Sequence, residues 1–300
     1  MRLLTLSLAL ALATTGLLLA QPQVSANEDA AAKAQAVLAQ ARAALGSEAK
    51  LKALQILTIS GNLHRVMGNR DLNGEVQLDI LLPDHTMKSE TLAPMPGAEM
   101  TTIEVLNGAE TWTDQSSGHG AGMVVIRRGP DTPQGRELAK LVVRAEITRL
   151  WLGLLLTAPA SSGITYSFAG TAEAPDGKAD VIEAKGANDF KVNLFLDQKT
   201  HRLLMITYQA RKPRMIMNTV AGGERPSEEE MQKRLKEAQA QAAAQPMVEH
   251  QVRFSEYKDE GGIAFPHRIS KAVEDEISEE WEFTKFKLNP GLKPEKFVKK

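Results

Sequence analysis

The stretch that decides the fold is Lys191–Gln209, KVNLFLDQKTHRLLMITYQ, where two runs rich in alternating apolar residues flank a short polar segment. Every second residue of the first run is apolar from Val192 to Leu196, which is typical of a strand because successive side chains point to opposite faces. Asp197 can accept backbone hydrogen bonds and Thr200 suits the end of the same turn. The stretch therefore predicts two antiparallel strands, and a turn explains Asp197, Thr200 and His201 without catalysis.

Apolar side chains occupy both faces of this predicted hairpin. Phe195 points away from Leu194, and together with Leu204, Ile206 and Tyr208 of the second run it leaves apolar groups on both faces of the pair. A sheet that is apolar on both sides needs two coverings, which are typically helices on one face and a second layer or a ligand on the other. We therefore expect helices to cover part of the sheet.

The rest of the chain repeats the strand pattern. The segment 74–84, GEVQLDILLPD, has apolar residues at every second position from Val76 to Leu82 and ends at Pro83. Similar runs continue to residue 288, and turn sequences such as PDGK and DEGG favour hairpins over helical crossovers. The sequence predicts a mainly β protein with some helix, built on one large, strongly curved antiparallel sheet of about eleven strands.

Three segments break the series of strands. Residues 27–46 are alanine-rich with an apolar stripe and predict an amphipathic helix that ends at Gly46. Residues 132–159 predict a helix whose last turns are apolar nearly all round, so something must cover it. Residues 220–246 begin a helix near Ser227 and contain few large apolar residues, which predicts a solvated helix or a mobile insertion.

The N-terminus has the features of a secretory signal peptide. Residues 1–26 contain Arg2, an apolar run and the small-residue cleavage site VSA. An uncleaved anchor is the alternative, since the apolar run is close to the length that spans a bilayer. We expect cleavage, a periplasmic or secreted single domain over 27–300, and no integral membrane span after the signal is removed. The chain has no cysteine, so it has neither a disulfide nor a cysteine for lipid attachment.

Composition and motifs argue against several other functions. The chain has 36 basic and 37 acidic residues, and this lack of excess positive charge argues against binding to nucleic acid. Six histidines are scattered without metal spacing, so we predict no metal and no cofactor, although a metal site assembled in three dimensions stays open. Met215 and Met217 have a spacing that suits copper, but methionine more often fills irregular apolar space. No nucleophile or acid pair stands out, so we predict no enzyme.

Several motifs together resemble one family. They are the helix ending ALGSEAKLKAL, the hairpin FLDQKTHRLLMITYQ, the segment VRFSEYKDEGGIAFPHRI and the final KPEKF. In this order they resemble the outer membrane lipoprotein-sorting, LolA-like superfamily of periplasmic proteins. The resemblance implies a half-open β-barrel covered by helices, whose concave side binds acyl chains or lipoproteins in transit. The insertion 220–246 is not part of the family's minimal pattern.

These observations lead to a first hypothesis of function. The chain is expected to hold a hydrophobic ligand, either a lipid or the acyl chains of a lipoprotein, in the hollow of the half-barrel by burial and release. The residues expected to line the hollow are Leu78, Ile80, Leu194, Leu196, Met205 and Trp281, and those expected in a lid are Trp151 and Leu154. A one-residue error in register would exchange inside for outside.

An alternative uses the same fold without a carrier activity. The protein would then be an envelope sensor or an assembly module that binds an envelope protein partner, with residues 220–246 as its docking element. Deletion of that segment would abolish partner capture and leave lipid binding intact. An outer-membrane barrel is disfavoured because the strands do not keep a single lipid-facing register.

Overall fold

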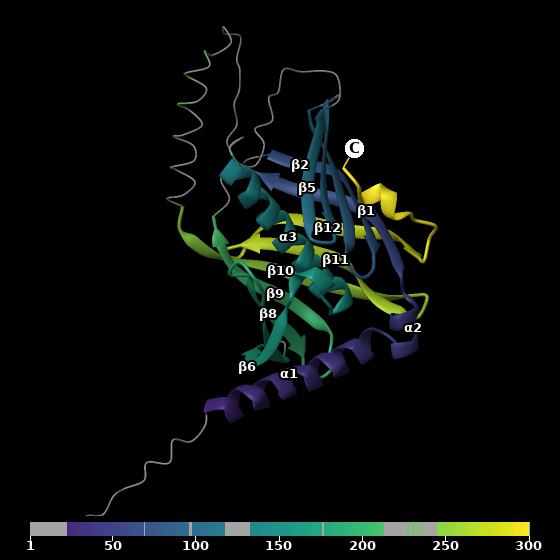
Figure 1. The fold of residues 1–300 in the computed structure, drawn as a ribbon, viewed down its shortest axis with the longest axis vertical. Helices are drawn as coiled ribbons and strands as arrows, with labels where there is room; N and C mark the ends of the chain where they lie inside the picture. The colour runs from purple at the N-terminus through teal and green to yellow at the C-terminus, as the bar shows by residue number, and fades with distance from the viewer. Residues whose placement is uncertain are drawn as a thin grey trace, which may run out of the picture.

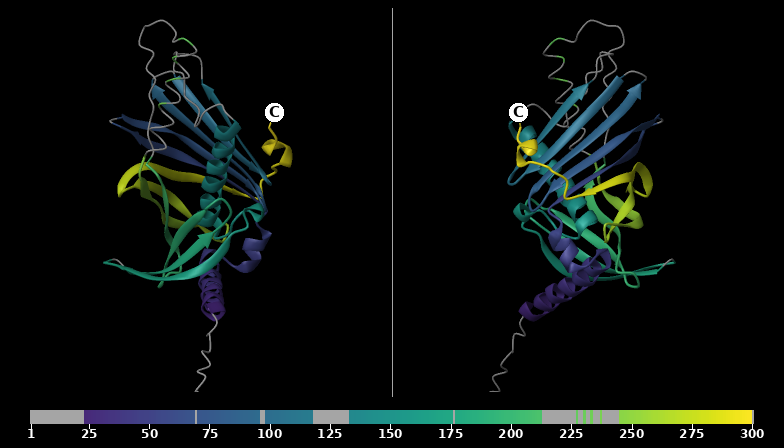
Figure 2. Two further views of the ribbon diagram at one scale, coloured as in Figure 1. Left: turned by 60° about the vertical axis from the view of Figure 1, so that its left-hand side comes forward. Right: turned by 90° about the vertical axis from the view of Figure 1, so that its right-hand side faces the viewer.

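The computed structural model describes residues 23–68, 70–95, 98–117, 133–175, 177–212, 245–299 and the single residues 227, 230, 233 and 237. Twelve strands form one antiparallel sheet in the order β5-β4-β3-β2-β1-β12-β11-β10-β9-β8-β7-β6. The sheet is strongly bent but not closed, since β5 and β6 lie at its two ends (Figures 1 and 2). The predicted curved antiparallel sheet is confirmed, with twelve strands in place of about eleven. Residues 123–128, which also have a strand pattern, lie outside the described residues.

The strands follow the alternating patterns closely and are joined mostly by tight hairpins. Their bounds are β1 Ile56–Met67, β2 Arg70–Leu81, β3 His85–Met95, β4 Ala98–Asn107, β5 Glu110–Ser117, β6 Thr165–Ala174, β7 Gly177–Lys185, β8 Lys191–Asp197, β9 Leu203–Arg211, β10 Met247–Glu260, β11 Ile263–Val273 and β12 Glu276–Leu288. The helices are α1 Gln23–Leu45, α2 Glu48–Ala53 and α3 Pro133–Leu155, with short 3-10 turns η1 Ala160–Ser162 and η2 Pro294–Phe297.

The turn between β8 and β9 forms as its sequence predicts. The Asp197 carboxylate accepts hydrogen bonds from the backbone N–H groups of Lys199 and Thr200, at 3.1 and 2.5 Å, and from the Thr200 hydroxyl at 2.7 Å. These bonds lower the pKa of Asp197, with the Thr200 hydroxyl as the largest cause. His201 follows with a positive φ of 56°. The acid and the threonine are thus used by the turn itself.

Helices α1 and α3 cover the same face of the sheet, which we call the concave face. Figure 2 shows α3 standing inside the bend of the sheet, with α1 below it. The Lys33 ammonium of α1 lies 3.6 Å from the centre of the Phe168 ring on β6, and the Arg42 guanidinium donates to the Leu155 carbonyl at the end of α3. The two helices and the concave side chains form one apolar core.

The C-terminal turn η2 lies on the opposite face, over β3 to β5. Phe297 is fully buried, its ring is 5.4 Å from that of His85, and its carbonyl accepts a hydrogen bond from the Trp112 indole. Lys296 reaches the buried Asp79 carboxylate at 2.7 Å. The β5 end of the sheet is therefore covered on both faces, by α3 on the concave side and by η2 on the other.

The signal peptide and the insertion stay predictions, because most of their residues lie outside the described part. Helix α1 begins at Gln23, inside the segment 1–26. In the insertion, the Ser227 hydroxyl accepts from the Glu230 backbone N–H at 3.3 Å, and the Glu230 carboxylate accepts from the Ser227 backbone N–H at 3.2 Å. This reciprocal pair is a capping box, which agrees with a helix that starts at Ser227.

Candidate functional site: the concave face

The apolar part of the concave face contains five of the six residues expected to line the hollow. Ladder pairing brings Leu78 and Ile80 of β2 opposite Ile59 and Leu57 of β1, and Leu194 of β8 opposite Ile206 of β9. Leu196 and Trp281 lie on the same face, and all five of these residues are fully buried beneath the helices. The structure thus shows them as a core that α1 and α3 cover.

Met205 is placed differently from the other five. It pairs with Phe195 of β8 and Arg253 of β10, whereas its neighbour Ile206 pairs with Leu194 on the concave face. The register shifts between Phe195 and Leu196, so the alternation does not run unbroken through the start of β9. Met205 therefore points to the opposite face, and we remove it from the proposed lining.

The second half of α3, from Val143 to Leu155, is fixed in the core. Trp151 and Leu154 are both fully buried, and the Trp151 indole N–H donates to the Thr86 hydroxyl at 2.6 Å. A Cβ atom at Gly153 would approach the Phe254 ring to 2.2 Å, so only glycine lets the helix pack this close. The apolar last turns are covered, as predicted. Trp151 and Leu154 belong to the part of the helix that is anchored.

A group of charged side chains lies on the concave face beside α3. We call it the ionic cluster, and its members are Arg65, Lys88, Glu90, Glu104, Glu146, Lys271 and Glu279. Six of them come from strands at concave positions, and Glu146 comes from α3. The Lys88, Glu90 and Glu104 side chains are 4%, 5% and 1% exposed. Charged side chains are almost never buried to this degree unless they are paired.

Short contacts join the ionic cluster into one network. Lys88 lies 2.7 Å from Glu104, 2.9 Å from Glu90 and 3.5 Å from Glu146. Arg65 lies 2.7 Å from Glu90 and 2.5 Å from Glu279, and Lys271 lies 2.6 Å from Glu279. The network therefore runs from β4 across β3 and β1 to β12 and β11.

Electrostatics keeps two carboxylates of the ionic cluster, Glu90 and Glu279, ionised. Burial alone would raise the pKa of Glu90, but Lys88 and then Arg65 outweigh it and hold that pKa well below its usual range. Burial likewise opposes ionisation of Glu279, and Lys271 is the largest cause that lowers its pKa. The pKa of Arg65 is raised because Glu90 and Glu279 outweigh the effect of burial. The folded protein thus holds fixed charges inside the bend of its sheet.

Trp281 lies between the ionic cluster and the apolar part. The Lys271 ammonium is 4.0 Å from the centre of a Trp281 ring and the Lys88 ammonium is 5.9 Å from it. Cations over an indole face are attracted by its ring electrons. The Trp281 indole N–H is buried and has no acceptor among the described residues. An unsatisfied buried donor of this kind is uncommon in folded proteins.

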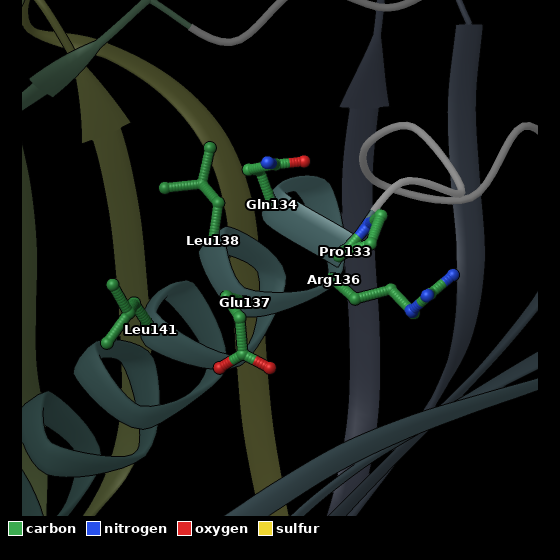
Figure 3. Close-up of a pocket in the computed structure, with 6 residues that line it drawn as sticks. All are labelled: Pro133, Gln134, Arg136, Glu137, Leu138 and Leu141. Carbon is green, nitrogen blue, oxygen red and sulfur yellow. The ribbon is translucent and has the colours of Figure 1, made fainter.

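The first half of α3, from Pro133 to Val142, has apolar side chains that the described residues do not cover. Leu138 is 63% exposed, and Leu141 and Val142 are each 39% exposed. A pocket of about 530 Å³ lies along this half of the helix, lined by Pro133, Gln134, Arg136, Glu137, Leu138 and Leu141. Figure 3 shows Leu138 and Leu141 projecting from one side of the helix and Arg136 from the other. The two halves of α3 thus differ sharply in burial.

Polar contacts hold α3 along its length. The Thr111 hydroxyl of β5 donates to the Lys140 carbonyl at 3.1 Å, and Arg144 donates to the Ala109 carbonyl. On the other side, the Arg149 guanidinium lies 3.9 Å from the centre of the Tyr208 ring of β9. These contacts place α3 across the hollow, between the β5 end of the sheet and β9.

Other chemistry finds no support in the described residues. No group of three or more histidine, aspartate or glutamate side chains there is arranged to hold a metal ion. In the same residues, no helix is both long and apolar enough to cross a membrane. His267 is buried, and its ring nitrogens face the Phe283 carbonyl at 3.1 Å and Glu260 at 3.2 Å. These partners give that histidine a structural role.

Sequence reasoning missed the ionic cluster. The alternation along β1 could have indicated it, because Arg65 lies an even number of residues after Leu57, Ile59 and Leu63 and therefore shares their concave face. Lys88 and Glu90 likewise occupy alternate positions of β3. Such residues at a strand's end are usually solvated, and their opposite charges come from distant strands. Arg65 and Glu279 are 214 residues apart in the chain.

Several solved structures are similar to this chain at low sequence identity. No protein-family model matches the chain, and no curated protein matches it. A LolA superfamily protein from Nitrosomonas europaea has a similar structure, with 11% identity over 89% of this chain and 97% of that one, and a TM-score of 0.45. A DUF1329 family protein from Desulfovibrio piger has 10% identity over 88% and 97% of the two chains, with a TM-score of 0.47.

A third structure is described as an outer membrane lipoprotein-sorting protein domain from Vibrio parahaemolyticus. It has 12% identity over 89% of this chain and 97% of that one, with a TM-score of 0.48. The names of the Nitrosomonas europaea and Vibrio parahaemolyticus proteins are those of the superfamily that the sequence resembles.

Proposed function

We propose that this protein binds a hydrophobic ligand, a lipid or the acyl chains of a lipoprotein, on the concave face of its sheet and carries it in the periplasm. The observation that carries the proposal is the apolar concave face under α3, together with the uncovered apolar residues Leu138, Leu141 and Val142 beside a pocket. Exposed apolar groups of this kind mark ligand or partner sites. Binding would involve burial and release, with no covalent step.

The asymmetry of α3 supports a route for the ligand. Its second half contributes buried residues such as Trp151 and Leu154, while its first half leaves Leu138 exposed. Moving the first half aside would cost little apolar burial, whereas moving the second half would open the core. A ligand that takes the place of the first half gains about 0.8 kcal/mol per buried methylene, which offsets the cost of capture.

The cellular setting of the proposal comes from the N-terminal segment. Residues 1–26 would direct export and be removed, which would release the binding protein into the periplasm. A carrier of this kind would meet its ligand at one membrane and release it at another or to a protein partner. The proposed partners are therefore lipids, lipoproteins and an envelope protein.

Lipid extraction tests the proposal directly. The exported protein is purified without detergent, extracted with organic solvent, and the extract is analysed by mass spectrometry, in parallel with titration of a fluorescent fatty acid. We expect an acyl lipid to co-purify and the probe to bind. An empty protein that also fails to bind the probe would contradict the proposal.

A matched pair of variants locates the binding surface. Leu141→Glu puts a charge beside the pocket on α3 and should weaken probe binding about tenfold, since burying a charge or losing an apolar contact costs about 1–3 kcal/mol. Leu204→Glu is the control, because Leu204 on β9 is 44% exposed, close to the 39% of Leu141. Equal effects of the two variants would place the ligand elsewhere.

A further inference from the structure

Helix α3 contributes both a carboxylate and apolar side chains to the concave face. Glu146 lies 3.5 Å from Lys88, while Val143, Ile147 and Leu150 on neighbouring turns are buried in the core. A carboxylate joined to an apolar body is the chemical pattern of an anionic amphiphile. We propose that Glu146 occupies the place of the ligand's head group, and that the ligand is an acyl chain with an anionic head that binds Lys88. This inference rests on the proposed function.

The position of Glu146 within the ionic cluster fits that role. Glu90 and Glu104 belong to the sheet and are 5% and 1% exposed, whereas the Glu146 side chain is 29% exposed. Its distance of 3.5 Å from Lys88 is also longer than the 2.9 and 2.7 Å of the other two carboxylates. Glu146 is thus the most exposed of these three carboxylates and the farthest from Lys88, on the turn of α3 that follows its first half.

A displacement of α3 that extends one turn beyond its first half, as far as Glu146, would take this carboxylate away from Lys88. The ammonium would then lose one of the three carboxylates that compensate for its burial, and a buried charge needs such partners. An anionic head group restores that contact, and a neutral ester or alcohol restores only part of it. The charge on Lys88 therefore favours an anionic ligand over a neutral one of the same chain length.

Three further side chains of this region suit an anionic head. Lys271 and Arg65 are the other cations of the ionic cluster, and their side chains are partly exposed. The Trp281 indole N–H is a buried donor without an acceptor among the described residues, and the Lys88 ammonium is 5.9 Å from the centre of that ring. An oxygen of the head group can accept from it, which would relieve the cost of the unsatisfied donor.

The test compares ligands that differ only in the head. Oleate, oleyl phosphate and methyl oleate are titrated at pH 8 into the full exported protein, each by displacement of the same fluorescent probe. Since a hydrogen bond to a charged group is worth about 1.5–3 kcal/mol, we expect an anionic ligand to bind at least about tenfold more tightly than methyl oleate. The comparison of oleate with oleyl phosphate distinguishes a fatty acid from a phosphate head.

Variants then assign that preference to Lys88 and Glu146. The double variant Lys88→Gln/Glu104→Gln removes one cation and one carboxylate together, and circular dichroism confirms that it folds. It should lose the preference for anionic heads. Glu146→Gln should bind all three ligands more tightly, by about fivefold, while keeping the preference. The control is Glu173→Gln, which removes another carboxylate 3.3 Å from a lysine, on the edge strand β6.

The outcomes separate the inference from the proposed function. If all three ligands bind equally well, or if the double variant keeps the full preference, the assignment of Lys88 is wrong and the proposal of a hydrophobic ligand still stands. If Glu146→Gln has no more effect than Glu173→Gln, Glu146 does not occupy the head-group place. If none of the ligands binds, both the proposed function and this inference fail.

Discussion

The two halves of α3 lie over the same sheet but meet different surfaces. From Val143 to Leu155 the helix packs on apolar strand residues, and nine of its thirteen residues are buried, including every residue from Leu150 on. From Pro133 to Val142 it leaves Leu138, Leu141 and Val142 exposed. The ionic cluster meets the helix at Glu146, close to the boundary between the halves. The second half of the helix is therefore an anchor in the core, whereas the first half could move away from the sheet with little loss of buried apolar surface.

The largest effect on stability is expected where the sheet buries charge. Lys88→Gln takes the Lys88 ammonium away from the buried Glu104 and removes one of the two cations that contact Glu90, which should lower the free energy of unfolding by about 3–5 kcal/mol. Urea unfolding of the purified wild type and variant measures this difference in the free energy of unfolding. The double variant Lys88→Gln/Glu104→Gln should recover most of the loss, because fewer charges stay unpaired. A single variant as stable as the wild type would contradict the buried network.

Alanine substitution of one leucine in each half of α3 tests whether the two halves differ in their contribution to stability. Leu154→Ala removes a fully buried side chain and should cost about 2–5 kcal/mol, whereas Leu138→Ala removes one that is 63% exposed and should change stability by less than about 0.5 kcal/mol. The same unfolding experiment measures both. Similar losses for the two variants would show that the first half of α3 is anchored as firmly as the second.

These residues also show how far the sequence predicts the structure. The alternation in β2 and β8 was enough to place Leu78 and Leu194 on one buried face. The assignment of Met205 to the same lining failed because an irregular register at the start of β9 changes the phase, and a register shift leaves no reliable mark in one sequence.

The ionic cluster was beyond sequence reasoning for a different physical reason. Whether Lys88 or Glu104 is solvated or buried depends on the bend of the sheet and on a helix from another part of the chain. The residues next to Lys88 and Glu104 in the sequence determine neither the bend of the sheet nor the position of that helix. By contrast, the turn at Asp197 was predictable because all of its hydrogen bonds are local.

Acid should weaken the region of the ionic cluster. The pKa of Glu90 is lower in the folded protein than its ordinary value of 4.5, so its contribution to stability is fully present above pH 4.5. That contribution is lost as the pH falls from there through the folded-state pKa. Thermal unfolding between pH 7 and pH 3 measures it, and Glu90→Gln should flatten the decline. An unchanged profile would mean that Glu90 is not ionised in the folded state.

The smallest effect is expected at the turn between β8 and β9. Thr200→Ala removes the 2.7 Å hydrogen bond to Asp197 and should cost about 0.5–1 kcal/mol. Thr171→Ala, at an exposed position on the edge strand β6, is the control and should have little effect. Ligand binding by Thr200→Ala should match the wild type. If Thr200→Ala lost ligand binding, the turn would have a role in function as well as in structure.

Hydrogen exchange along α3, measured by mass spectrometry with and without oleate, tests the central claim most directly. The account predicts that amides of the first half and of the turn that follows it, from Arg136 to Glu146, exchange faster when the ligand is bound, while those from Ile147 to Leu155 keep their protection. A ligand that binds without changing exchange in the first half, or that loosens both halves alike, would contradict the division of α3 into an anchor and a displaceable segment.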